Sequence, residues 1–466
     1  MKQFIKPLAF LFIVIALCGC GKEFLDVKRD ANQVVPKEVK DYLAIINRSN
    51  MFGTSTDLAC IGADEYFVPS RAELIAGSQY TPFQKNAYVW ADDVYEREMN
   101  IKDWHEGYER IMYANLALDV EKIDPAASEK EDWNRVRVAA RFHRAWNYFQ
   151  LAQVFCSVYD PSTVAEELGL PLRLDYDISV SYTRSSLKQV YDQILKDLHE
   201  AVSIPLTGSE SIYIPGNIAV KALLARVYLQ MGDYDSALKY AEEVLAENKN
   251  LVDFNTLSAD INSIYSSYFE FFGKNNPSIL FFSYNTAGGF LSGPRYHANP
   301  EYLSLYEEHD LRFKINFYNE SPNRYVYIGS YYGDGVNSPF TGLSVEEVLL
   351  IRAECLARSN RIDKAMEDLN FLRRHRYNHQ QLELVEAYDR NVALHLIFEE
   401  RLRELYMRGR RWEDARRLNR EGEFLTTFRR ELEGELFELK PGSKKWVWPI
   451  PQNEVETNNI PQNDRY

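Results

Sequence analysis

The sequence predicts a mainly α-helical protein whose short helical hairpins form a right-handed scaffold, with long loop-rich insertions and a few short strands. Two observations predict this fold class. Apolar residues recur at the helical spacing of three and four positions in several separate stretches. Between these stretches lie two long segments, 48–103 and 248–343, that are rich in aromatic and turn-forming residues and lack that spacing. At 466 residues the chain is long enough for one large domain or two ordinary ones.

The clearest helical stretch is Lys221–Leu245, which has the pattern of two amphipathic helices joined by a tight turn at Gly232. A glycine suits the left-handed conformation that ends many helices. Ala225 and Ala237 stand where two helices approach closely, which requires short side chains. This alternation of small and aromatic residues resembles a tetratricopeptide (TPR) hairpin. A single such unit buries too little surface to be stable, so further hairpins are expected.

Similar patterns recur, and the TPR-like hairpins are predicted at about 104–204, 218–245, 345–374 and 394–419. Placing Ala365 on Ala237 brings Ala353 onto Ala225, so the small residues repeat in register. The hairpins do not follow the regular period of about 34 residues of a tandem TPR array. We therefore expect the segments 48–103 and 248–343 to be insertions that gather on one side of the stacked helices.

The start of the chain predicts a lipoprotein signal. Two lysines precede the apolar run Leu8–Leu17, which is shorter than the about 20 residues needed to span a bilayer and has the form of a secretory signal. The ending Leu17-Cys18-Gly19-Cys20 resembles the bacterial lipobox, by which Cys20 would become the lipidated first residue. The alternative is an ordinary cleaved signal peptide. We expect residues 1–19 to be removed and 20–466 to form a single domain.

Charge and cysteine content narrow the function classes. The formal net charge of −14 argues against nucleic-acid binding, which needs a basic surface. Apart from Cys20, three cysteines follow the signal, which are too few for a disulfide framework. Cys156 and Cys355 lie on apolar helical faces where core residues are expected. No His or Cys cluster has metal-ligand spacing, so we expect neither a metal nor a cofactor.

Several short motifs follow one another along the whole chain. They are Phe24-Leu25-Asp26-Val27, Arg144-Ala145-Trp146-Asn147-Tyr148-Phe149, Gly169-Leu170-Pro171-Leu172, Val190–Leu198, Glu346–Glu354, Gly409–Asp414 and Trp448–Glu454. In this order they resemble the SusD/RagB family of outer-membrane nutrient-binding lipoproteins. The middle loops are compact for that family.

Two of these motifs also have a direct physical interpretation. Two prolines exclude helix from Trp448-Pro449-Ile450-Pro451, which is expected to be an extended strap packed on the helical body. A cluster of charged residues near the end of the chain is expected to form salt bridges that fix the last hairpin against this tail, in preference to a ligand site. Its eight members are Glu400, Arg401, Arg410, Arg411, Glu413, Asp414, Arg416 and Arg417.

The resemblance implies a binding protein and not an enzyme, attached by lipid to the outer membrane and exposed at the cell surface. It would capture a glycan or glycan-derived oligosaccharide and deliver it to a SusC-like TonB-dependent transporter. Two alternatives are capture of a peptide and a TPR scaffold lipoprotein of envelope assembly. An enzyme such as a secreted glycosidase is disfavoured because the sequence has no nucleophile elbow, metal signature or phosphate loop.

The ligand is expected to contact aromatic and acidic side chains of the two insertions, because aromatic faces stack on sugar rings and carboxylates accept hydrogen bonds. The candidates are Asp64, Tyr66 and Tyr80 in the first insertion and Tyr296, Tyr331, Tyr332 and Asp334 in the second. Packing within the loops is the alternative for each. Replacing Tyr331 and Tyr332 together by alanine is expected to abolish ligand binding without lowering the melting temperature.

Overall fold

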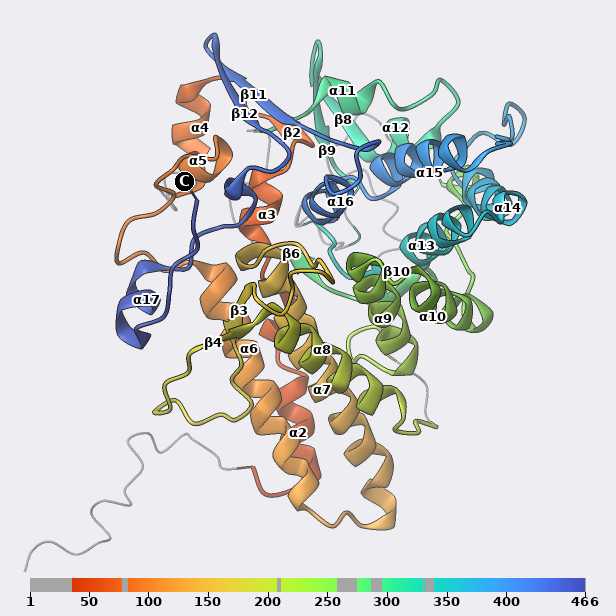
Figure 1. The fold of residues 1–466 in the computed structure, drawn as a ribbon. Coiled ribbons are helices and arrows are strands. Elements are labelled where there is room, and N and C mark those ends of the chain that lie inside the picture. The colour runs from red at the N-terminus through yellow and green to blue at the C-terminus, as the bar shows by residue number, and fades with distance from the viewer. Residues whose placement is uncertain are drawn as a thin grey trace, which may run out of the picture.

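The structure, a computed structural model, describes residues 36–77, 83–207, 211–257, 275–285, 296–329, 331 and 339–465. Its frame is a series of long helices in which each helix from α6 to α15 packs on the next (Figure 1). These helices are α6 (Lys102–Leu118), α7 (Lys130–Phe155), α8 (Leu187–Val202), α9 (Asn217–Met231), α10 (Tyr234–Glu247), α13 (Val345–Arg358), α14 (Ile362–Arg374) and α15 (Arg390–Glu404), followed by the shorter α16 (Arg411–Leu418). The fold is mainly α, as the sequence predicts.

Short elements occupy the segments between the long helices. The short α-helices are α2 (Val39–Ile46), α3 (Asp57–Gly62), α4 (Arg71–Gly77), α5 (Phe83–Tyr88), α11 (Pro300–Leu303), α12 (Leu311–Asn316) and α17 (Gln452–Asn458). The 3-10 helices are η2 (Ser49–Phe52), η3 (Asp119–Lys122), η4 (Ala127–Glu129), η5 (Phe254–Thr256) and η9 (Lys444–Trp446). The described strands pair two by two and close no barrel.

The helix pair α9–α10 shows why this sequence makes hairpins. Gly232 ends α9 with a φ of +77°, the left-handed conformation that glycine adopts without strain. The side chain of Asp233 then caps α10 by accepting a hydrogen bond from the Ser236 N–H. Ala225 and Ala237 are fully buried where the two helices meet. The pair lies where the sequence predicts it.

The two insertions lie side by side, as expected. Strand β1 (Gly53–Thr54) pairs in parallel with β6 (Tyr284–Asn285), and β2 (Tyr66–Phe67) pairs antiparallel with β7 (His297–Ala298). The remaining pairs are β5 (Ile279–Phe281) with β10 (Leu343–Ser344), β3 (Leu168–Pro171) with β4 (Arg184–Ser186), β8 (Phe317–Ser321) with β9 (Arg324–Tyr327), and β11 (Phe428–Leu432) with β12 (Glu435–Leu439). The backbone ladders β1·β6 and β2·β7 therefore tie the first insertion to the second.

One expectation about the first insertion is wrong. The segment 48–103 is not irregular throughout, because it contains α3, α4 and α5. Helices of six or seven residues make fewer than two turns, too few for a helical period to appear in the sequence.

The C-terminal strap packs on the helical body, as the prolines predict. Trp448 and Ile450 are fully buried, and the Trp448 N–H donates to the carbonyl of Val154 in α7 at 3.0 Å. The Trp448 ring stacks on Trp412 with centroids 5.4 Å apart. Both rings sit against Gly62, where an added Cβ would lie 2.7 Å from Trp448 and 2.8 Å from Trp412. A glycine is thus required at position 62 for this close approach.

Cys156 and Cys355 are buried free thiols, as predicted from their apolar helical faces. Within the described ranges, no helix combines the length and the apolar character needed to cross a membrane.

Replacing Gly232 by alanine should lower the free energy of unfolding by about 1 kcal/mol, because a side chain is strained at a φ of +77°. Steric contact does not contribute, since a Cβ at Gly232 would meet no atom within 4 Å. Gly422 is the matched control, because it is equally unobstructed and has no left-handed φ. Denaturant unfolding should show a lower free energy of unfolding for Gly232→Ala and an unchanged one for Gly422→Ala. Equal unfolding midpoints for the two variants would contradict the left-handed conformation at Gly232.

Candidate functional site

The described parts of the two insertions meet around Tyr66. This side chain is 1% exposed, and its hydroxyl donates to the carbonyl of Ile61 at 2.8 Å. Its ring meets the edge of the buried Tyr296 ring, with centroids 5.6 Å apart. The guanidinium of Arg430 on β11 lies 4.8 Å from the centre of the Tyr66 ring. Tyr66 and Tyr296 thus join the two insertions to the C-terminal hairpin, and neither faces solvent.

Asp64 lies next to this contact and forms a two-pronged ion pair. Its carboxylate accepts from Nε and Nη2 of Arg411 on α16 at 2.7 and 2.8 Å. The hydroxyl of Tyr302 on α11 donates to the same carboxylate at 2.8 Å. Asp64 therefore fixes the first insertion to both the second insertion and the last hairpin.

Tyr331 is also an interior side chain. It is 5% exposed, donates a hydrogen bond of 2.7 Å to Glu346 on α13, and lies under the guanidinium of Arg408 at 3.9 Å. A buried tyrosine with these contacts stabilises the fold. Its replacement by alanine is therefore expected to lower the melting temperature, in contrast to the expectation from the sequence.

Tyr80, Tyr332 and Asp334 lie outside the described residues, as do Cys20 and the segment 1–19. The structure thus brings Asp64, Tyr66 and Tyr296 into one cluster and places Tyr331 in a separate one around Arg408. The ligand-binding role of all seven candidates stays a prediction.

Glu65 is a residue that the sequence analysis missed. It is buried beside Asp64, and its carboxylate accepts a hydrogen bond from the Met407 N–H at 2.6 Å. Burial raises the pKa of Glu65 to about 8. Two consecutive acidic residues in a loop are usually exposed. No local sequence pattern therefore shows that Glu65 is buried.

The charged residues of the last hairpin form a buried network of ion pairs, as predicted. Among the described residues these pairs join the hairpin to α12, α13 and the first insertion, whereas the sequence analysis expected the C-terminal tail as the partner. Arg312 on α12 lies 2.5 Å from Glu400 and 2.8 Å from Glu404, both on α15, and Arg403 lies 2.9 Å from Glu400. Burial alone would raise the pKa of Glu400, but Arg312, Arg403 and Arg373 together lower it well below its ordinary range. These groups form ion pairs with one another that join α12 to α15.

A second part of the network surrounds Asp414 on α16. Asp414 pairs with Arg401 at 2.9 Å and with Arg417 at 2.8 Å, and Arg417 also pairs with Glu354 on α13 at 2.6 Å. Although burial opposes it, Arg401 and Arg417 lower the pKa of Asp414 to about 2. Arg410, in the turn before α16, pairs with the buried Glu413 at 2.8 Å, so this turn belongs to the network as well.

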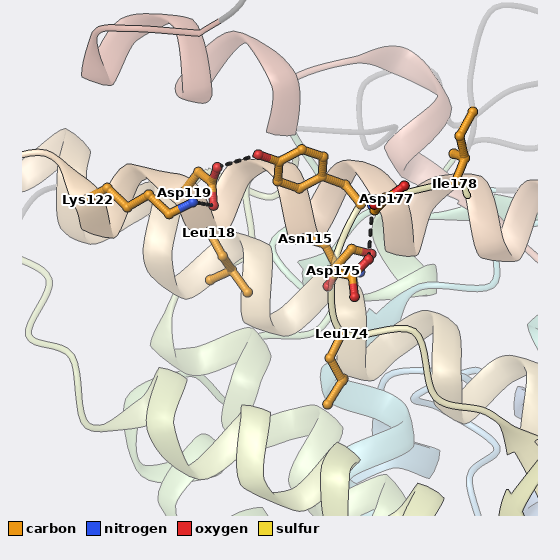
Figure 2. Close-up of a pocket in the computed structure, with 9 residues that line it drawn as sticks. Asn115, Leu118, Asp119, Lys122, Leu174, Asp175, Asp177 and Ile178 are labelled. Carbon is orange, nitrogen blue, oxygen red and sulfur yellow. Dashed lines mark hydrogen bonds and ion pairs between the residues drawn. The ribbon is translucent and has the colours of Figure 1, made fainter. Parts of the chain in front are cut away.

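A hollow of about 640 Å³ lies between the end of α6 and the loop that connects β3 to β4 (Figure 2). It is lined by Asn115, Leu118, Asp119, Lys122, Leu174, Asp175, Tyr176, Asp177 and Ile178. The Tyr176 hydroxyl donates to Asp119 at 2.8 Å, and Lys122 pairs with Asp119 at 2.7 Å. The hollow continues along α6 into two smaller ones of about 190 and 180 Å³, which share Tyr108 and Arg173.

Another cavity of about 670 Å³ lies where the C-terminal tail meets α16, and Arg416 is on its wall. Arg416 donates to the carbonyls of Gln153 and Cys156 at the end of α7. It therefore caps that helix, whose C-terminus attracts positive charge.

Among the residues that the structure describes, no group of three or more His, Cys, Asp or Glu side chains is placed to hold a metal ion.

Two family models match the chain. The first, described as "Starch-binding associating with outer membrane", matches residues 23–229, and the second, described as "SusD family", matches residues 345–466. Between them they cover both ends of the described helical frame. No curated protein matches the chain significantly.

Solved structures share the fold. A SusD superfamily protein from Bacteroides thetaiotaomicron is 20% identical with a TM-score of 0.71, and the match covers 92% of this chain and 100% of that chain. A putative sugar binding protein from Bacteroides vulgatus is 20% identical with a TM-score of 0.69, covering 92% and 99%. A SusD-like carbohydrate binding protein from Bacteroides vulgatus is 16% identical with a TM-score of 0.65, covering 91% and 97%.

Replacing Glu400 by glutamine should lower the free energy of unfolding by about 3 kcal/mol or more, because it removes the buried carboxylate that Arg312 and Arg403 share. The matched control is Asp192→Asn, which breaks the exposed pair with Lys188 and should cost less than about 0.5 kcal/mol. Denaturant unfolding compares the two variants. A Glu400→Gln protein as stable as Asp192→Asn would show that the network is not structural.

Glu65→Gln should gain stability relative to the wild type as pH rises from about 5 to 8.5. A carboxyl whose folded-state pKa is raised contributes stability that is full below its unfolded pKa of about 4.3 and is lost as pH rises through the folded value of about 8. Glutamine keeps an acceptor for the Met407 N–H and does not ionise. Because one pKa unit corresponds to about 1.4 kcal/mol, the effect should reach a few kcal/mol.

Melting temperatures of both proteins at several pH values measure this effect. Glu96→Gln, at an exposed position, is the control. Its melting temperature should differ from that of the wild type by the same amount at every pH. If the melting temperature of Glu65→Gln also differed from that of the wild type by the same amount at every pH, the raised pKa of Glu65 would be refuted.

Proposed function

Because the chain belongs to the SusD/RagB family, we propose that it is a cell-surface nutrient-binding lipoprotein that captures a glycan or glycan-derived oligosaccharide and delivers it to a SusC-like TonB-dependent outer-membrane transporter. The observation that carries the proposal is the pair of family matches at 23–229 and 345–466, in the order expected for one SusD-like chain. The names of the matched family and of two neighbouring structures support a carbohydrate as the ligand class.

The ligand would be held without covalent chemistry by the two insertions. In this proposal Tyr66, Tyr296 and Asp64 position the insertions, because their side chains are engaged with the protein itself. Direct contact is assigned to Tyr80, Tyr332 and Asp334, whose residue types supply a stacking face and hydrogen-bond acceptors. Release into a transporter requires moderate affinity, so a Kd in the micromolar range is expected.

Attachment would come from lipidation of Cys20 after removal of residues 1–19. Several acyl chains, each worth about 0.8 kcal/mol per buried methylene, would hold the protein at the outer membrane. The proposed role is capture and delivery, and the ligand is expected to leave the protein chemically unchanged.

Calorimetric titration of the chain without its signal, using panels of neutral oligosaccharides, acidic oligosaccharides and peptides, tests this function. Heat with an oligosaccharide, and no new product by chromatography, is the expected result. Binding of peptides alone would change the ligand class, and new products would identify an enzyme. Absence of binding heat with all three panels would overturn the proposal.

Two substitutions separate contact from positioning. Tyr332→Ala should weaken oligosaccharide binding at least about tenfold with an unchanged melting temperature, since one lost stacking contact is worth about 1.4 kcal/mol or more. Tyr331→Ala should lower the melting temperature, because this side chain is buried against Glu346 and Arg408. Unchanged affinity in Tyr332→Ala would remove this residue from the site.

A further inference from the structure

The three hollows beside α6 form one continuous groove. The hollow of about 640 Å³ shares Asn115 and Tyr176 with that of about 190 Å³, which shares Tyr108 and Arg173 with that of about 180 Å³. One wall is α6 and the other is the loop 172–183, which connects β3 to β4. Because α6 has 17 residues and rises 1.5 Å per residue, the groove is roughly 25 Å long. An extended ligand suits this shape.

The loop 172–183 is a fixed wall, because side chains of two helices hold its backbone. The carbonyl of Arg173 accepts from the Tyr148 hydroxyl on α7 at 2.7 Å and from the Asn115 amide on α6 at 3.0 Å. The same amide donates to the carbonyl of Asp175 at 2.8 Å. A wall that is ordered before binding loses little conformational entropy when a ligand enters the groove.

Tyrosine rings lie along the whole groove. Tyr176 is at one end, Tyr182 is at the other, and Tyr108 forms the floor between them. The Tyr176 hydroxyl donates to Asp119 at 2.8 Å, and the Tyr182 hydroxyl donates to Asp175. Each of these two rings is therefore held at its tip, while Tyr176 remains 43% exposed and Tyr182 partly exposed. Rings held in this way offer a flat apolar face for stacking.

The lining of the groove is acidic. Among the lining residues that the structure describes, five carboxylates oppose two permanent cations. The acids are Glu109, Asp119, Asp175, Asp177 and Glu454, and the cations are Lys122 and Arg173. Such a surface repels the negative charge of a uronate, sulfate or phosphate group. The groove therefore disfavours an acidic ligand.

A cationic ligand is also disfavoured, because acids of the groove are already paired with its own bases. Asp119 pairs with Lys122 at 2.7 Å (Figure 2), and Glu454 lies 3.5 Å from the ring of His105. A carboxylate that is paired in this way keeps lone pairs that accept hydrogen bonds from hydroxyl groups. Hydrogen-bond acceptors beside aromatic faces suit a ligand with many hydroxyl groups and no charge.

We propose that the groove along α6 is a second carbohydrate site, separate from the two insertions, and that it takes a neutral oligosaccharide in extended form. The rings of Tyr176 and Tyr182 stack on sugar units, and Asp119 and Asp175 accept hydrogen bonds from their hydroxyl groups. The inference rests on the proposed function for the ligand class. It adds a site whose lining comes from α6, η3, the loop 172–183 and the C-terminal tail.

Hydrogen exchange of the chain without residues 1–19, measured by mass spectrometry, locates the site. The neutral probes are maltohexaose, cellohexaose and xylohexaose, with hexagalacturonate as the acidic probe and pentalysine as the basic one. A neutral probe at about ten times its Kd should slow exchange of the backbone amides of 172–183 about tenfold, because the groove must be vacated before the loop opens.

Each other outcome of this experiment has a defined meaning. Slower exchange in the insertions alone would overturn the second site and leave the proposed function intact. Protection of 172–183 by the acidic or the basic probe, and not by a neutral one, would overturn the ligand class. If no neutral probe slows exchange in any segment, the proposed function and this inference both fail.

Substitutions of the two tyrosines separate stacking from the shape of the loop. Tyr176→Ala with Tyr182→Ala should weaken binding in the groove at least about tenfold. Tyr176→Phe with Tyr182→Phe keeps both rings without their hydroxyls and should stay within about threefold of the wild type. Tyr388→Ala is the matched control, because Tyr388 is exposed and its hydroxyl also donates to a carboxylate, that of Glu386. Equal losses in the alanine and phenylalanine proteins would overturn stacking as the mode of binding.

Discussion

The structure depends on the pairing of buried guanidinium and carboxylate groups in its C-terminal half. Arg312 brings the second insertion onto α15 through Glu400 and Glu404, and Arg376 joins the end of α14 to Glu404 and to Glu346 on α13. Each charge is isolated from water, so its solvation must be replaced by partners in fixed positions. Removing any one member deprives its buried partners of part of their compensating charge. This constraint explains why a helical frame with short connections can carry long insertions in one defined arrangement.

The two halves of the chain are joined by a different kind of contact. The Trp448 ring, its stacking partner Trp412 and the bare backbone at Gly62 pack three distant segments together. Arg416 then caps α7, and Asn463 in the tail donates to the carbonyl of Phe155. The segments matched by the two family models therefore share one core, because the tail of the second half closes over the longest helix of the first.

The helical hairpins and the C-terminal strap were predictable because their signals are local. Each signal determines the backbone conformation of residues close to it in the sequence. The signals are a helical period, a left-handed glycine at 232 and two prolines near 450. The fate of Tyr66 and Tyr331 was not predictable, since it is decided by Arg430 and Arg408, far away in the chain. An irregular segment gives the same sequence pattern whether its tyrosines face a ligand or the core. The segment 172–182 alternates between apolar and polar residues but forms a loop. Asp175 and Asp177 accept hydrogen bonds from backbone N–H groups two residues on, which competes with a strand ladder.

The two insertions and the loop between β3 and β4 are held by separate sets of contacts. Figure 1 shows β2, β8 and β9 of the insertions at the upper end and the yellow β3–β4 loop at the lower left. The insertions are tied to α16 and its preceding turn through Arg411 and Arg408, whereas the loop is tied to α6 through Asn115 and Tyr176. A side-chain rearrangement on ligand binding would therefore be transmitted first to the last hairpin. The loop between β3 and β4 would keep its shape when the insertions rearrange, because Asp175, Asp177 and Ser179 bond to one another within it.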